Sequence, residues 1–183
     1  MEFSQLVSSR RTVHNYVAEK VSDELVREAL RLSLWAPNHK LTFPWVYTWI
    51  GPRARNDLAE LSVDLKSAKE TLSPVKAQAT RDNVLTPSHL ISLAIRRSDE
   101  KRLHEDYATL ACSVQIATLQ LWSHGVYSKW STGGWSTHAR SYKILGLDPQ
   151  EVQLEGCLMI GKALHIPPTP ERPPLEHFLR NVD

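Results

Sequence analysis

The segment His104–His124 is predicted to form one long helix that is apolar on two sides. Neither proline nor glycine interrupts it, and Gly125 follows as a natural C-terminal stop. One side carries a continuous apolar stripe at helical spacing, and Ile116 and Leu119 make the other side apolar as well. Such a helix must be covered on both sides, either in a large core or against another subunit. Because the chain has only 183 residues, we expect a subunit interface and therefore a homodimer.

Helical and strand patterns are interspersed on either side of this segment. Ser22 is a good N-cap for a helix that must end before Pro37, and another helix is expected to open near Pro52. Clusters of β-branched and aromatic residues bounded by glycine and proline predict strands. The predicted helices are Phe3–Val7, Ser22–Trp35, one from Pro52 through Leu65, and Thr137–Leu145; the predicted strands are Trp45–Ile50, Leu90–Ile95, Val126–Trp130 and Leu154–Ile160.

Two stretches lack a clear periodic pattern. Lys69–Pro87 is polar and interrupted by Pro74, which predicts a mobile excursion. Ile166–Asp183 contains five prolines, which favours an extended C-terminal arm on the single domain formed by residues 1–183. An extended arm needs a surface to lie on, and a partner subunit would supply one.

The charge balance and the apolar runs exclude several classes of protein. The 22 Lys and Arg residues face 20 Asp and Glu residues, a mixture too even for the basic surface of a nucleic-acid binder. No apolar run reaches the roughly 18 residues that a membrane-spanning helix requires. Glu2 and Gln5 stand where a signal peptide would carry basic residues. We therefore expect a cytoplasmic protein that binds neither nucleic acid nor a membrane.

Sequence motifs for nucleophilic or metal catalysis are absent. The chain contains no HExxH, GxSxG, Walker or GxGxxG sequence, and its eight histidines are scattered. Cys112 and Cys157 lie in apolar stretches without CxxC spacing, so we expect two buried thiols and neither a disulfide nor a metal site. We also expect no catalytic side chain of these kinds.

Four short sequences together form a familiar pattern: Ser9–Tyr16 (SRRTVHNY), Ala36–Trp45 (APNHKLTFPW), Gly125–Gly134 (GVYSKWSTGG) and Glu171–Glu176 (ERPPLE). They resemble the nitroreductase family, whose corresponding sequences are S-R-R-S-x-R-x-F, A-P-S-x-x-N-x-Q-P-W, G-x-G-x-x-W-x-x-G and R-K-P-L-E. No single sequence is specific, but their order spans the chain from residue 9 to residue 176. The chain is therefore identified as resembling this family, in a branch with small subunits.

The first and fourth sequences concern the phosphate of FMN. In the family, residues matching Arg10, Arg11 and Thr12 hold this phosphate, and the residue matching Arg172 adds a further cation. The physical chemistry agrees, because a dianionic phosphate prefers planar guanidinium groups and a hydroxyl donor in one small space. One proline is inserted beside Arg172, so its register differs from the family pattern. Taken alone, an arginine pair at a helix C-terminus is more often a solvated charge pair that interacts favourably with the helix dipole.

The other two sequences match the family with substitutions. Leu41 and Phe43 replace an Asn and a Gln, so the polar contacts to FMN expected there are lost, whereas His39 resembles a histidine of the small-subunit branch. A rigid turn that enters a core strand is the alternative interpretation of Pro44 and Trp45.

The glycine-bearing turn after the long helix is assigned to the flavin edge. Ser131, Thr132 and Gly133 match the family sequence there, and glycine allows backbone amides to approach a flat ring. A plain strand-to-helix turn is the alternative. His14 stands where the family commonly has Arg or Lys near flavin N1, so the stabilising charge would be weaker or would titrate near neutral pH. Alternatively, His14 is a surface side chain.

The resemblance implies an α+β fold in which a mixed, mainly antiparallel sheet is flanked by helices. It also implies a long central helix at a dimer interface and two FMN sites built from both subunits. The implied activity is that of an FMN-dependent oxidoreductase, which passes electrons from NAD(P)H to a nitroaromatic, a quinone or a similar small acceptor by a ping-pong mechanism. In this mechanism the flavin itself performs the redox chemistry.

Two other functions agree with the same sequence. An FMN-binding protein without nitroreductase turnover, acting as a flavin store or as a specialised dehydrogenase, is compatible with the losses at Leu41 and Phe43. A dimeric interaction module without flavin is the third hypothesis. The colour of the purified protein and its response to NADPH distinguish the three.

Overall fold

A computed structural model describes residues 2–182, and its strands pair into one five-stranded sheet. The strands are β1 (Tyr16–Val17), β2 (Trp45–Trp49), β3 (His89–Arg96), β4 (Tyr127–Ser131) and β5 (Val152–Ala163). The long strand β5 pairs with β1, β3 and β4, and β3 also pairs with β2. All these pairings are antiparallel, and Thr12 and Ser128 add an isolated parallel bridge. The predicted mainly antiparallel sheet is confirmed.

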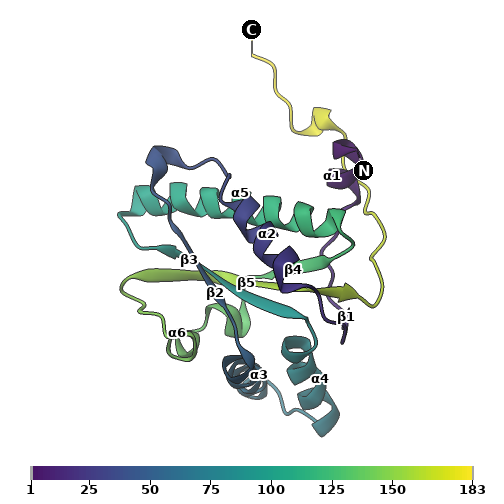
Figure 1. Ribbon diagram of the computed structural model, residues 1–183, viewed down its shortest axis with the longest axis vertical. Helices are drawn as coiled ribbons and strands as arrows, with labels where there is room; N and C mark the ends of the chain where they lie inside the picture. The colour runs from purple at the N-terminus through teal and green to yellow at the C-terminus, as the bar shows by residue number, and fades with distance from the viewer. Residues whose placement is uncertain (1, 183) are drawn as a thin grey trace.

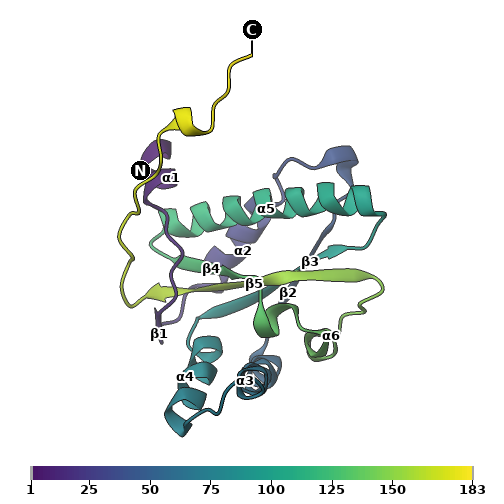
Figure 2. The same cartoon turned by 180° about the vertical axis from the view of Figure 1, so that it is seen from behind.

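Helices cover both faces of this sheet (Figure 1). One face is covered by α2 (Asp23–Ser33) and α5 (Glu100–Ser123), and the view from behind shows the same layers (Figure 2). The opposite face carries α3 (Pro52–Ser67), α4 (Pro74–Leu85) and α6 (Ala139–Leu145). The remaining helices are α1 (Phe3–Ser9) and the 3-10 turns His39–Leu41, Gly134–Thr137 and Leu175–His177. The predicted α+β class is thereby confirmed.

The hydrophobic core lies in two layers because successive strand residues point to opposite faces. On β3, Ile91, Leu93 and Ile95 pack in the cluster that includes the inner side of α5, whereas Leu90 packs in the cluster that includes Leu58 of α3. All five of these side chains are at most 1% exposed. Each such side chain contributes about 1.5–3 kcal/mol when it is fully buried.

The long helix α5 is buried on one side only in a single chain. Its inner residues pack on the sheet, whereas Ile116 and Leu119 on the opposite side are half-buried. Cys112 also lies away from the sheet and is exposed, so the expectation of a buried thiol was wrong there. Cys157 is buried in β5, as expected, and neither cysteine is bonded to another. Helical periodicity alone could not show which apolar side of α5 the sheet covers.

The prediction of a mobile excursion over Lys69–Pro87 was wrong, because this stretch contains α4. Ser73 caps the helix by accepting a hydrogen bond from the Lys76 amide, and Pro74 occupies the first turn, where its missing N–H costs nothing. The helix buries only Thr80 and Val84, and its sequence has almost no periodic apolar pattern from which the helix could have been predicted. The start of this helix is therefore specified by its cap and not by its pattern.

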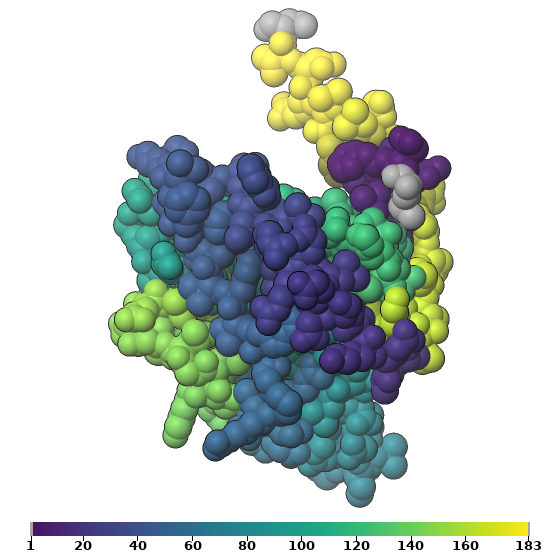
Figure 3. Space-filling model, in the orientation of Figure 1, coloured from purple at the N-terminus to yellow at the C-terminus, as the bar shows by residue number. Residues whose placement is uncertain are grey.

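The chain ends in an exposed arm. From Leu164 to Val182 no residue is buried, and the only regular structure is the turn Leu175–His177. Figure 3 shows this arm, in yellow, leaving the body of the molecule beside α1, in purple. Several apolar side chains on the arm and on α1 are exposed: Phe3, Val7, Leu164, Ile166, Leu175, Phe178, Leu179 and Val182. No helix within residues 2–182 is long and apolar enough to cross a membrane.

Candidate functional site

The segment from Arg10 to His14 runs beside β4 and divides its side chains between two hollows. Thr12 pairs with Ser128 of β4, and the Val13 amide donates to the Ser128 carbonyl at 3.2 Å. Val13 is fully buried and anchors the segment. Arg10 and Thr12 line one hollow, and His14 lines another. Alternation of side chains along extended backbone places Arg10 and Thr12 on one side of the segment and the buried Val13 on the other.

The first hollow, which we call the arginine hollow, has a volume of about 300 Å³. It lies between the segment at Arg10, the strand β4 and the flank of α5 that carries the buried residues Val114 and Thr118. Its lining combines hydrogen-bond donors with apolar surface and contains no carboxylate. The lining residues are Arg10, Thr12, Ala111, Val114, Gln115, Thr118, Ser128 and Trp130.

Cations gather at this hollow without a matching anion. Burial lowers the pKa of Arg10 below its ordinary value, and the neighbouring cations of Arg11 and Arg172 lower it further. The structure therefore brings Arg172 of the arm near Arg10, from opposite ends of the chain. None of the ion pairs formed within residues 2–182 involves these three arginines. Such a cluster is suited to a bound anion.

The two neighbouring arginines have different surroundings. The guanidinium of Arg11 turns back toward α1, where it donates to the Ser8 carbonyl at 2.6 Å and to the Arg10 carbonyl. Its Nε atom is buried without a hydrogen-bond partner among the described residues. Arg11 does not line the arginine hollow. Its side chain therefore closes the C-terminal end of α1, where unpaired carbonyls accept cationic donors.

The second hollow, which we call the lysine hollow, has a volume of about 340 Å³ and lies toward α3 and α4. It brings His14 together with Ser131, another residue predicted from sequence. Two lysines and several neutral hydrogen-bonding groups complete the lining, again without a carboxylate. The lining residues are His14, Asn15, Ser62, Lys66, Thr80, Asn83, Lys129, Ser131, Trp135 and Met159.

The other predicted site residues lie outside both hollows. Thr132 and Gly133 are exposed in the turn directly after Ser131. At Gly133 the backbone is extended, with φ −136°, and no atom lies within 4 Å of the position that a Cβ would occupy, so a side chain would fit there. His39 is also exposed, with its Nε2 atom 3.9 Å from a carboxylate oxygen of Glu105. Within one chain, His39 is not brought to the other predicted residues.

The loop around His39 holds a strained backbone. Lys40, Leu41 and Phe43 adopt left-handed φ values of 55°, 51° and 47°. Asn38 supports the loop by accepting from the Phe43 amide at 2.8 Å and by donating to the Thr42 hydroxyl at 2.8 Å. The Leu41 and Phe43 side chains are 67% and 56% exposed. Strained backbone of this kind persists where neighbouring contacts hold it, and it clusters at functional sites.

Sequence reasoning missed a glycine that shapes the site. Gly156 of β5 has a φ of 134°, and a Cβ atom there would lie 2.3 Å from the Ser131 carbonyl oxygen. The same Cβ would lie 2.7 Å from Nε1 of Trp130, which donates to the Glu155 carbonyl at 3.0 Å. Gly156 therefore allows β4 and Trp130 to approach β5 closely. No local sequence signal marks this role, because the contact is made across strands.

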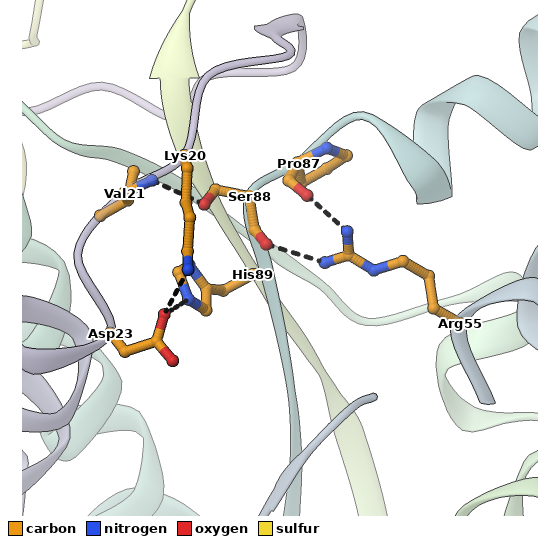
Figure 4. Close-up of polar contacts among 7 residues, drawn as sticks. All are labelled: Lys20, Val21, Asp23, Arg55, Pro87, Ser88 and His89. Carbon is orange, nitrogen blue, oxygen red and sulfur yellow. Dashed lines mark hydrogen bonds and ion pairs between the residues drawn. The ribbon is translucent and has the colours of Figure 1, made fainter. Parts of the chain in front are cut away.

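A different polar cluster lies around the start of β3, where three segments meet (Figure 4). Arg55 donates to the Pro87 carbonyl at 2.8 Å and to the Ser88 carbonyl at 3.2 Å. His89, which is 5% exposed, donates from Nε2 to Asp23 at 3.1 Å. Burial lowers the pKa of His89, although the Asp23 carboxylate opposes this shift. The groups in this cluster largely satisfy one another.

Known proteins resemble this chain in both sequence and structure. The sequence model of the nitroreductase family matches residues 7–162. YfhC of Bacillus subtilis, whose name describes an NAD(P)H nitroreductase, is 21% identical over 173 residues, which are 93% of this chain and 89% of that protein. The crystal structure of a nitroreductase-like family protein from Bacillus cereus matches with a TM-score of 0.87 at 22% identity, over 100% of this chain and 97% of the other.

A further solved structure that matches this chain is that of the FMN-dependent nitroreductase NfnB from Mycobacterium smegmatis in complex with NADPH. It matches with a TM-score of 0.76 at 18% identity, over 98% of this chain and 97% of the other. At these identities the likeness to solved structures establishes the nitroreductase-like fold.

Proposed function

This chain belongs to the nitroreductase family, and from that premise we propose that it is an FMN-dependent oxidoreductase that uses NAD(P)H. The observation that carries the proposal is the unneutralised cluster of Arg10, Arg11 and Arg172 beside the arginine hollow. Bringing cations together in a partly buried place is unfavourable unless an anion neutralises them. The phosphate of FMN is an anion of the required charge and size.

The donors at the arginine hollow fit this phosphate. Arg10 and Arg172 offer planar guanidinium groups, and Thr12 adds a hydroxyl from the same segment. Arg11 adds positive charge at a distance, because its own donors are used by backbone carbonyls. From the phosphate, the flavin ring would extend along β4 toward His14, Ser131 and the following turn.

Bound FMN would supply the redox chemistry, namely the acceptance of a hydride from NAD(P)H and the donation of two electrons to an acceptor. The task of this chain is to hold the ring, leave one face open and exclude competing groups. The turn at Thr132 and Gly133 is exposed beside the hollows, which leaves room for a flat second molecule. We propose that donor and acceptor use this place in turn, as a ping-pong mechanism requires, with a nitroaromatic or quinone as acceptor.

We also propose that two chains form a homodimer with two FMN sites built from both subunits. The outer side of α5, helix α1 and the arm expose apolar side chains that a single chain does not cover. His39 and the strained loop with Leu41 and Phe43 lie apart from the other predicted site residues in one chain. A second subunit would allow this loop to reach the partner's flavin.

An absorption spectrum tests the proposed function directly. The purified protein, or the apo-protein titrated with FMN, should show the two visible absorption bands of a bound flavin. Addition of NADPH or NADH under argon should bleach these bands, and menadione or a nitroaromatic should restore them. Sedimentation equilibrium at micromolar concentration should give the mass of a dimer.

Three other outcomes would overturn parts of the proposal. A flavin that stays yellow with both nicotinamides would indicate an FMN-binding protein without turnover, for which the losses at Leu41 and Phe43 provide a reason. Colourless protein that does not bind added FMN would indicate an interaction module. A stable monomer that retains FMN would exclude the shared sites.

A further inference from the structure

The helix α5 buries a carboxylate that has no cation beside it. Asp106, in the second turn of the helix, is 3% exposed, and none of the ion pairs within residues 2–182 involves it. Among the described residues its one hydrogen-bond partner is Thr42, whose hydroxyl donates to Oδ1 of Asp106 at 2.6 Å. A buried carboxylate without a cation is costly. Asp106 lines neither hollow, so its role depends on the residue that it holds.

Thr42 belongs to the loop Asn38–Phe43, which joins α2 to β2 and lies beside the first turns of α5 (Figure 1). The Asn38 side-chain amide donates to the Thr42 hydroxyl at 2.8 Å, and its carbonyl oxygen accepts from the Phe43 amide at 2.8 Å. Together with the bond from Thr42 to Asp106, these bonds form a continuous chain. The chain connects the rigid helix α5 to the backbone of the loop.

This chain of bonds holds a backbone that is unfavourable by itself. Lys40, Leu41 and Phe43 all have left-handed φ values, in which the Cβ atom crowds the following carbonyl oxygen. Pro44 restricts Phe43 further, because a proline ring crowds the residue before it. The sheet fixes this end of the loop, since the Pro44 carbonyl accepts from the Arg96 amide at 2.9 Å. Without its side-chain support, the loop would favour negative φ values.

We propose that Asp106 is a positioning residue, which acts through Thr42 and Asn38 to hold the loop in the conformation that presents Leu41 and Phe43 to the flavin of the partner subunit. This inference rests on the proposed function, in which the loop reaches that flavin. In one chain both apolar side chains are exposed, and a flat ring would cover them. A loop that is already ordered loses less conformational entropy on binding, so the flavin is bound more tightly.

Flavin affinities of the dimer test this inference. The apo-protein would be titrated with FMN and with riboflavin by fluorescence quenching, for the wild type and for Thr42→Val, which keeps the shape of the side chain and lacks the hydroxyl. Both affinities should fall by the same factor, about tenfold, because the loop faces the ring that the two flavins share. This result would differ from that expected for Arg10→Ala, which should weaken FMN binding selectively.

Conservative variants and a matched control separate positioning from a general loss of stability. Thr42→Ser keeps a hydroxyl and Asp106→Asn keeps an accepting oxygen, so both should bind the flavins as the wild type does. Thr109→Val removes a buried hydroxyl from α5 at a position that lines neither hollow, and it should also match the wild type. A purely structural role of Asp106 would lower the urea midpoint of Thr42→Val without changing the flavin affinity of the folded protein.

Hydrogen exchange at the Phe43 amide gives a second readout that does not depend on flavin. This amide donates to Asn38, which is supported by Thr42 and Asp106. In the apo-protein its exchange should be about tenfold faster in Thr42→Val than in the wild type, because the loop opens more often. Thr42→Ser should exchange at the wild-type rate.

The possible results distinguish this inference from the proposed function. If the wild type binds both flavins but Thr42→Val keeps the wild-type exchange rate, the inference is overturned and the proposed function stands. The same holds if exchange accelerates while both flavin affinities stay unchanged, or if FMN binding alone is weakened. A wild type that binds neither flavin would overturn the proposed function and this inference with it.

Discussion

Two clusters of charged side chains in this molecule differ in what neutralises them. At the start of β3, Arg55 donates to backbone carbonyls and His89 donates to Asp23, so the chain supplies the partners (Figure 4). At the arginine hollow, Arg10 and Arg172 lie near each other with no carboxylate partner among the described residues. The folded chain supplies most partners of the first cluster, with only Nδ1 of His89 unpaired among its described side-chain atoms, whereas we propose that a ligand completes the second.

This difference separates residues that hold the fold from residues that bind. Arg55 connects α3 to the linker between α4 and β3, and α4 in turn places Thr80 and Asn83 at the lysine hollow. Loss of Arg55 should therefore affect stability. Loss of Arg10 leaves no partner buried without a bond, so it should affect ligand affinity and leave the fold intact.

The largest effect is expected for Arg55→Met. Removal of its charged hydrogen bonds to the Leu85, Pro87 and Ser88 carbonyls should lower the free energy of unfolding by about 3 kcal/mol. Urea denaturation of the apo-protein measures this change, with Arg53→Met on the same helix as an exposed control. Equal stabilities for the two variants would contradict the assignment of Arg55 to the fold. The ratio of FMN to riboflavin affinity should stay at its wild-type value.

The next effect concerns Arg10 and Arg172. If both hold one phosphate, Arg10→Ala or Arg172→Ala should weaken FMN binding by roughly tenfold to a hundredfold, which is about 1.5–3 kcal/mol. Riboflavin has no phosphate and should be bound almost as before. Because both residues contact one ligand, the double variant should lose less than the sum of the two single losses. Flavin fluorescence quenching measures both affinities, and an equal loss for the two flavins would show that the phosphate lies elsewhere.

A smaller effect is expected for Arg11→Ala, although Arg11 is adjacent to Arg10 in sequence. Its guanidinium already donates to the Ser8 and Arg10 carbonyls, so it contributes only screened charge to the phosphate. FMN affinity should fall by about threefold or less, which is roughly 0.7 kcal/mol. The same quenching titration is the measurement, and a loss as large as that of Arg10→Ala would mean that Arg11 contacts the ligand directly.

The smallest expected effect is a pH dependence of the free energy of unfolding, because burial and the Asp23 carboxylate shift the pKa of His89 in opposite directions. Burial outweighs the Asp23 carboxylate and lowers the folded-state pKa of His89. The folded state therefore binds fewer protons than the unfolded state, and stability falls as the pH drops below the ordinary histidine pKa of about 6.5.

The hydrogen bond from His89 lowers the pKa of Asp23, so a second loss of stability should follow below about pH 4. Urea midpoints between pH 8 and pH 5 measure the first change. His89→Gln, which keeps a donor to Asp23, should remove the decline in this range. An unchanged decline in the variant would assign the titration to another group.

Much of the fold was readable from the sequence because its signals are local. The apolar stretch Leu90–Ile95 and the long apolar helix predicted elements that the structure places within β3 and α5. Helix α4 was missed because a cap and a proline specify it, with almost no buried stripe. The short strand β1 was missed because two residues carry no period.

The candidate site also depends partly on local sequence signals and partly on tertiary contacts. The sequence by itself determined the residue types of the proposed phosphate site, since Arg10, Thr12 and Arg172 belong to short motifs that can be recognised from the sequence alone. Only the tertiary structure decided that Arg172 lies near Arg10, that Lys66 and Lys129 share a hollow with His14, and that Gly156 must lack a side chain.

The physical reason is that periodicity reports which side of an element is apolar, whereas it does not report what covers that side. Cys112 illustrates this, because its helix is apolar on two sides and the sheet covers only one. Contacts between elements depend on strand register and on helix packing, which are settled by the whole core at once. The sequence therefore determines which residue types are available to the candidate site, and the packing of the whole core determines which of them come together.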